Sequence, residues 1–82
     1  MDPHPERPRY YVLAYDTGSL RVLAFTGHEH DFTGAVLTLT RRLQQHRHHP
    51  EVAVRLLAAA STADLLDRHA ELFGRLRFPD PD

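Results

Sequence analysis

The stretch from Arg9 to Thr26 constrains the fold of this chain more than any other. It holds two runs rich in Tyr, Val, Leu and Phe, residues 9–16 and 19–26, which meet at the tetrapeptide Asp16-Thr17-Gly18-Ser19. Asp and Gly between apolar runs are typical of a tight β-hairpin, because glycine takes a positive φ without steric cost. The stretch therefore predicts two antiparallel strands joined by a two-residue turn at the centre of the tetrapeptide.

Both faces of this predicted hairpin are apolar. With a two-residue turn, one face carries the pairs Tyr15 with Leu20, Leu13 with Val22, and Tyr11 with Ala24. The other face carries the pairs Tyr10 with Phe25, Val12 with Leu23, and Ala14 with Arg21. A sheet covered by helices on one side normally alternates apolar and polar residues, so this hairpin is either enclosed within its own chain or docks on a partner.

The composition is that of one soluble globular domain. The chain has 82 residues, of which 41% are hydrophobic and 26% charged, and its formal net charge is −1. That near balance argues against a protein that binds nucleic acid mainly through a basic surplus. The sequence has no Cys, which excludes disulfides, thiolate nucleophiles and Cys-based metal sites. No apolar run approaches the roughly 18 residues of a membrane span and the start of the sequence lacks a signal-peptide pattern, so we predict a cytoplasmic protein without membrane contact.

The chain after the hairpin predicts a helix and a third strand. Apolar residues at helical spacing, namely Phe32, Val36, Leu39 and Leu43, indicate a helix over residues 32–48. Asp31 is placed to cap its start, and Pro50 ends it. Alternation of apolar and mixed residues predicts a strand over residues 51–60.

A second helix is predicted after this strand. Ser61 or Thr62 caps it, with Asp64 as the capping-box partner of Ser61 and Gly74 as its C′ residue. Residues 75–78 can add a short strand. Residues 1–8 are predicted to be a disordered leader, residues 9–78 the single domain, and residues 79–82 a frayed tail.

The element order ββαβα predicts an α+β fold. A right-handed connection through the first helix brings the third strand beside the first, which gives a mainly antiparallel three-stranded sheet of order 2-1-3. With both helices on one face, the protein is a two-layer sandwich whose other sheet face stays open. We expect this interaction face to carry Tyr10, Val12, Arg21, Leu23, Phe25 and Arg55.

The turn tetrapeptide is similar to the active-site tetrad of aspartic proteases, and Leu72-Phe73-Gly74-Arg75 resembles the Gly-Arg segment near the end of retroviral-type proteases. Such enzymes are all-β dimers that pair one Asp from each chain and close on Gly-rich flaps. The chain between the two segments is helical in pattern and offers no such flap. A plain hairpin turn is therefore the favoured interpretation, and hydrolysis at Asp16 of a dimer stays an alternative.

Two His-rich segments are the candidate metal ligands: His28-Glu29-His30-Asp31 and His46-Arg47-His48-His49. They flank the predicted first helix and lie roughly 25 Å apart at 1.5 Å per residue, so one chain cannot close both on a single ion. We predict that they are solvated surface residues and that the protein has neither a metal site nor a cofactor.

Several segments together carry a family resemblance. They are the run Tyr11-Val12-Leu13-Ala14-Tyr15-Asp16, the strand Glu51-Val52-Ala53-Val54 and the helix Arg68-His69-Ala70-Glu71-Leu72-Phe73. With the ββαβα order, these segments resemble small uncharacterised proteins of GC-rich bacterial genomes. The resemblance implies the fold and no particular activity.

The sequence therefore predicts a non-catalytic domain that acts by binding. We expect a homodimer, or docking on another protein, through the open sheet face or an exposed strand edge. The alternative from a different class is a sheet-face binder of single-stranded nucleic acid, in which Tyr10 and Phe25 stack on bases between Arg21 and Arg55.

Overall fold

The computed structural model describes residues 8–78. Its elements are β1 (Arg9–Asp16), β2 (Val22–Glu29), α1 (Phe32–Gln45), β3 (Val52–Ala59), α2 (Thr62–Arg68) and α3 (Ala70–Arg75). The strands form one antiparallel sheet of order β2-β1-β3. The predicted α+β class, element order and sheet order are confirmed. The predicted tail, and the predicted leader apart from Pro8, lie outside the described residues.

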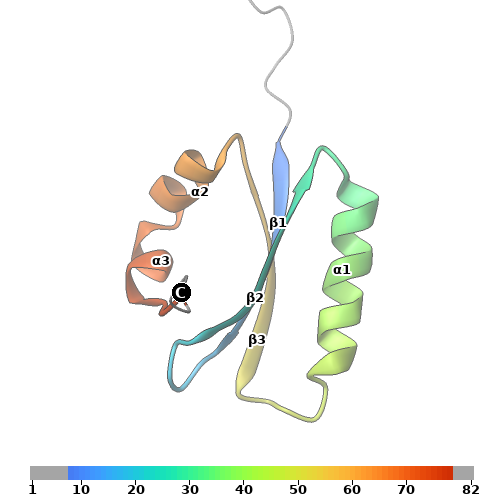
Figure 1. The fold of residues 1–82 in the computed structure, drawn as a ribbon, viewed down its shortest axis with the longest axis vertical. Helices are drawn as coiled ribbons and strands as arrows, with labels where there is room; N and C mark the ends of the chain where they lie inside the picture. The colour runs from blue at the N-terminus through green and yellow to red at the C-terminus, as the bar shows by residue number, and fades with distance from the viewer. Residues whose placement is uncertain (1–7, 79–82) are drawn as a thin grey trace, which may run out of the picture.

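The helices lie on opposite faces of the sheet, with α1 on one side and α2 and α3 on the other (Figure 1). The prediction that both helical segments share one face is wrong. On the face of α2 and α3, the core joins Tyr11, Leu13 and Tyr15 of β1 to Leu65 and Leu76. The sheet is therefore the middle layer of three.

The central strand explains this arrangement. Every residue of β1 from Tyr11 to Tyr15 is buried, whichever face its side chain points to. Successive side chains of a strand point to opposite faces, so a helical layer on one face alone would leave half of this apolar run in water. On the α1 face the fully buried residues Val12, Ala14 and Ala35 fill the space between helix and sheet.

The turn between β1 and β2 is longer than predicted. The amide of Asp16 donates to the Arg21 carbonyl at 2.9 Å, and the amide of Leu20 donates to the Asp16 carbonyl at 2.8 Å. The positive φ of this turn, 61°, belongs to Leu20, and Gly18 has no positive φ. Strand β2 consequently begins at Val22 instead of Ser19.

A bulge at Leu23 then changes which residues of β2 share a face with which residues of β1. Tyr15 pairs with Val22, whereas Ala14 pairs with Ala24 and leaves Leu23 as the extra residue. An extra residue inverts the alternation of the strand beyond it. Phe25 consequently pairs with Leu13 instead of Tyr10.

The predicted caps are confirmed at both helix starts. The carboxylate of Asp31 accepts from the amide of Gly34 at 2.9 Å and caps α1. The hydroxyl of Ser61 accepts from the amide of Asp64 at 3.1 Å and caps α2. The Asp64 carboxylate accepts from the amide of Ala60 at 2.9 Å and not from that of Ser61, so the predicted capping box is not formed in its standard pattern.

The other predicted boundaries need correction. Helix α1 ends at Gln45, before Pro50, and the predicted second helix is broken at His69 into α2 and α3. Gly74 lies inside α3 and is not a C′ residue. In place of a strand over residues 75–78, one parallel bridge joins Arg77 to Arg21. Within residues 8–78 no helix has the length and apolar character needed to cross a membrane.

Candidate functional site

The residues of the predicted open face do not share one face. Tyr10 and Val12 lie on the α1 side, where the ring of Tyr10 meets that of Phe32 edge-on at a centroid distance of 5.2 Å and Val12 is 1% exposed. Phe25 lies on the opposite side and stacks on Tyr11 at 5.6 Å.

The remaining members of the set are also separated. Arg55 pairs with Leu13 across β1 and β3, so it lies on the α2 and α3 side. Arg21 is exposed at the bridge to Arg77, and Leu23 is 48% exposed in the bulge. Because helices cover both faces of the sheet, the prediction of one open face is wrong, and these residues do not form a stacking platform for bases.

The Asp16 carboxylate holds the turn together. One oxygen, Oδ1, accepts from the amides of Gly18 and Ser19, each at 2.8 Å. These backbone N–H groups, that of Ser19 first, lower the pKa of Asp16 below its usual 3.8 because they stabilise the charged form. The aspartic-protease tetrad therefore occurs here in an α+β domain, whereas the proteases it resembles are all-β.

The His-rich segments have separate local partners. His28 Nε2 lies 2.9 Å from the Thr38 hydroxyl, His30 Nδ1 lies 3.3 Å from the Pro8 carbonyl, and His49 Nδ1 lies 3.3 Å from Glu51. In the part of the chain that the structure describes, no group of His, Asp and Glu side chains is arranged to hold a metal ion.

The edges of the sheet are the places where backbone groups remain accessible. Thr17 and Glu51 lie opposite each other, and the Thr17 amide donates to the Glu51 carbonyl at 2.7 Å. Hydrogen-bonded and non-hydrogen-bonded pairs alternate along an antiparallel ladder. Since Thr17 is hydrogen-bonded to Glu51, the odd-numbered residues of β1 also form their backbone hydrogen bonds with β3. On β3, the N–H and C=O groups of Val54, Leu56 and Ala58 consequently point away from the sheet. No strand lies beyond them in the chain from Pro8 to Phe78.

The outer edge of β2 is obstructed. Its start is occupied by Arg77, whose amide donates to the Leu20 carbonyl at 2.7 Å and whose carbonyl accepts from the Val22 amide at 2.9 Å. The bulge at Leu23 distorts the strand. Bulges and covering segments are devices by which proteins prevent strand edges from pairing with other chains.

The outer edge of β3 has none of these devices among its residues. All eight residues of β3 pair with β1 without a register shift. The strand reads Val-Ala-Val-Arg-Leu-Leu-Ala-Ala, with Arg55 as its single charge and neither Pro nor Gly. A regular, apolar edge of this kind is a ready template for a further strand.

Helix α1 adds apolar side chains beside the same edge. The contact between Thr38 and His28 of β2 places Thr38 on the β2 side of the helix. Val36 and Leu43 lie about 140–160° around the helix axis from Thr38, so they lean toward β3. Leu43 is 50% exposed there, whereas Leu37, 62% exposed, points away from the sheet.

The sequence contained a signal of this edge. The predicted apolar stripe included Phe32 and Leu43, yet both are about half exposed, and the residue of α1 that is fully buried is Ala35. Leu43 is therefore offset toward the β3 edge, whereas Phe32 packs on Tyr10 of the central strand. Sequence spacing alone does not show this offset from the buried face, because it depends on how the helix packs on the sheet.

Comparison of this chain with known protein families, with curated proteins and with solved structures gave no match. The resemblance to small proteins of GC-rich bacterial genomes stays a prediction.

Proposed function

We propose that this protein is a small interaction domain that self-associates through the β3 edge. Two copies pair their β3 strands antiparallel around a two-fold axis perpendicular to the sheet, so that one continuous sheet crosses the dimer. The observation that carries the proposal is the outward row of backbone groups at Val54, Leu56 and Ala58 on an edge without a bulge, proline or covering segment in the described chain.

The charge on Arg55 selects the register. If Arg55 lay opposite Arg55 of the second copy, two like charges would face each other at short range, which is destabilising. Centring the pair on Leu56 avoids this contact. Val54 then lies opposite Ala58 of the second copy, so the outward N–H and C=O groups are in register to exchange hydrogen bonds.

The same axis brings the two α1 helices together on one face of the joined sheet. Leu43 and Val36 lean toward β3 and then lie at the seam between the copies. Burial of the half-exposed Leu43 adds apolar contact to the backbone hydrogen bonds. Both kinds of contact are present in stable interfaces, whose centres are more apolar than the rest of the surface.

Matched leucine variants of α1 test this arrangement. Leu43→Lys places a charge at the seam, whereas Leu37→Lys places the same charge on the outer side of the same helix. We expect the dimer dissociation constant, measured by sedimentation equilibrium, to rise about tenfold or more for Leu43→Lys and to stay near the wild-type value for Leu37→Lys.

A proline variant tests the backbone contribution separately. Ala58→Pro removes an amide that points away from β1, so it leaves the hydrogen bonds between β1 and β3 intact. We expect this variant to remain folded by circular dichroism and to be monomeric. A wild-type protein that is monomeric at high micromolar concentration would refute the proposal, as would equal effects of the two lysine variants.

A further inference from the structure

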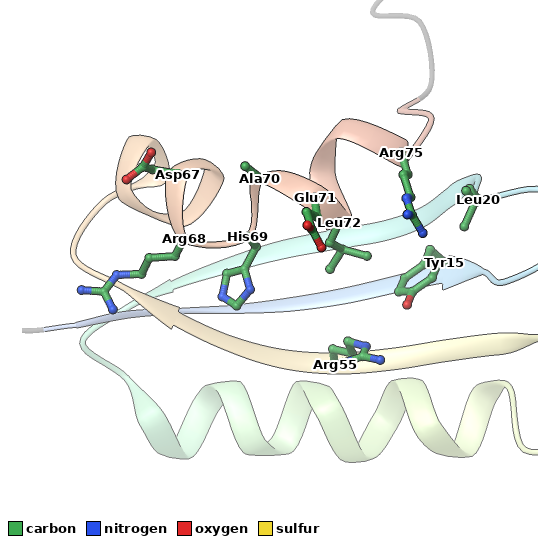
Figure 2. Close-up of a pocket in the computed structure, with 10 residues that line it drawn as sticks. All are labelled: Tyr15, Leu20, Arg55, Asp67, Arg68, His69, Ala70, Glu71, Leu72 and Arg75. Carbon is green, nitrogen blue, oxygen red and sulfur yellow. The ribbon is translucent and has the colours of Figure 1, made fainter.

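A cavity of about 630 Å³ lies between the α2 and α3 layer and the sheet (Figure 2). Its volume falls within the range of small-molecule sites, about 300–1,000 Å³. The chain turns from α2 into α3 at His69, whose φ and ψ of −118° and 37° break the helix above the cavity. Residues of both the helical layer and the sheet line this space.

The lining combines apolar and polar side chains. Leu20, Leu72 and Tyr15 supply apolar surface. Tyr15 is buried, at 6% exposure, and its hydroxyl has no hydrogen-bond partner among residues 8–78 while the ring borders the cavity. A site with an apolar body and a few convergent polar groups is the usual form of a small-molecule pocket.

Two guanidinium groups enter the cavity from opposite walls. Arg75 extends from α3 toward Tyr15, and Arg55 lies on β3 beside it (Figure 2). Tyr15 pairs with Ala53, so Arg55 is its diagonal neighbour on the same face of the sheet. Neither guanidinium forms an ion pair with another residue of the described chain. Among residues 8–78 nothing occupies their donors, and guanidinium geometry is well suited to binding an anion.

The other charges of the lining differ in availability. Arg68 is already held by Asp64, with its Nε 2.7 Å from the carboxylate. Asp67 lies on the side of α2 away from the sheet (Figure 2). Glu71 borders the cavity four residues before Arg75, so its negative charge opposes an anion at the same place.

We propose that this cavity binds a small organic carboxylate whose apolar or aromatic body lies against Tyr15, Leu20 and Leu72 while Arg55 and Arg75 hold its carboxylate. Arg55 belongs both to this site and to the proposed pairing strand β3. Arg75 lies on α3, so its loss tests the cavity and leaves the β3 edge unchanged.

Calorimetric titration with phenylacetate tests the site, with 2-phenylethanol as the neutral counterpart and acetate as the anion without a ring. We expect phenylacetate to bind in preference to both. Arg75→Gln should weaken phenylacetate binding about tenfold, because it removes a charge-assisted hydrogen bond to the carboxylate. Glu71→Gln should strengthen it. Arg41→Gln removes an exposed charge from α1, across the sheet from the cavity, so it is the matched control and should leave phenylacetate binding within about twofold.

The competing outcomes overturn the proposal. They are a lack of saturable phenylacetate binding up to about 10 mM, equal binding of 2-phenylethanol, or equal losses in Arg75→Gln and Arg41→Gln. Arg75 and Arg41 are both exposed, so these variants are expected to fold. Thermal unfolding of each variant checks this, and the opposite sign expected for Glu71→Gln cannot arise from general loss of structure.

Discussion

Replacement of Leu65 by alanine tests whether α2 and α3 form a second core on the sheet. Leu65 is 0% exposed and lies in the cluster formed with β1 and β3. Buried Leu→Ala substitutions cost about 2–5 kcal/mol, because they lose the transfer free energy of the side chain and leave a cavity. A domain of 82 residues has a free energy of unfolding of about 4–12 kcal/mol. A loss of about 3 kcal/mol would therefore lower the melting temperature by about 12–24 °C.

Leu66 supplies the matched control for this experiment. It follows Leu65 on α2 and is 46% exposed, so its replacement by alanine should cost less than about 1 kcal/mol. Urea unfolding followed by circular dichroism measures both variants, with equal slopes confirming that the same surface unfolds. Equal losses in the two variants, or a loss below about 1 kcal/mol for Leu65→Ala, would refute the second core.

Two further predictions concern local structure. Gly74 lies within α3, and no atom lies within 4 Å of the position a Cβ would take there. Gly74→Ala should therefore raise the free energy of unfolding, measured by urea titration, by about 0.5–1 kcal/mol. A destabilised variant would instead indicate that Gly74 is a left-handed C′ residue. The pKa of Asp16 is lowered below 3.8 by the backbone amides of Ser19 and Gly18, so the stability this carboxylate contributes is present above pH 3.8 and is lost as the pH falls through its folded pKa. In urea titrations, the Asp16→Asn variant should therefore lose less stability than wild type between neutral pH and about pH 3. An equal loss in variant and wild type would contradict a stabilising role of the Asp16 carboxylate in the turn.

The elements and their order were predictable because they depend on local patterns. Asp31 and Ser61 stand directly before apolar helical spacing, and each caps a helix as expected. The alternation of β3 placed a strand within one residue of its observed bounds, Val52–Ala59. Such signals involve residues close in sequence.

Local patterns did not predict which residues of β2 lie on which face of the sheet. The structure differs from the predicted hairpin at the turn, where Leu20 takes a positive φ that its residue type rarely adopts, and at the bulge at Leu23. The longer turn shifts the partner of Tyr15 from Leu20 to Val22, which keeps each residue on its face, so the bulge alone moves Phe25 to the face opposite Tyr10. The sequence predicts that both faces of the hairpin are apolar. The structural reason is that helices of the same chain cover β1 on both sides.

The candidate site was predictable only in part. A strand edge is one of the expected routes of association, and β3 is an edge strand of the sheet. Arg55 was expected on an open face, but it borders the cavity beneath α3. Arg75 lines the same cavity but is distant from Arg55 in sequence. It is therefore a candidate only because α3 packs over the sheet.

Amide hydrogen exchange along β3 tests the proposed association most directly. The amides of Val54, Leu56 and Ala58 point away from β1, whereas the Leu57 amide points toward Tyr11 and serves as the internal reference. We expect the outward amides to become protected as the protein concentration rises, and the Leu57 amide to be protected at every concentration. Fast exchange of the outward amides at the highest concentration, with Leu57 still protected, would contradict pairing through the β3 edge.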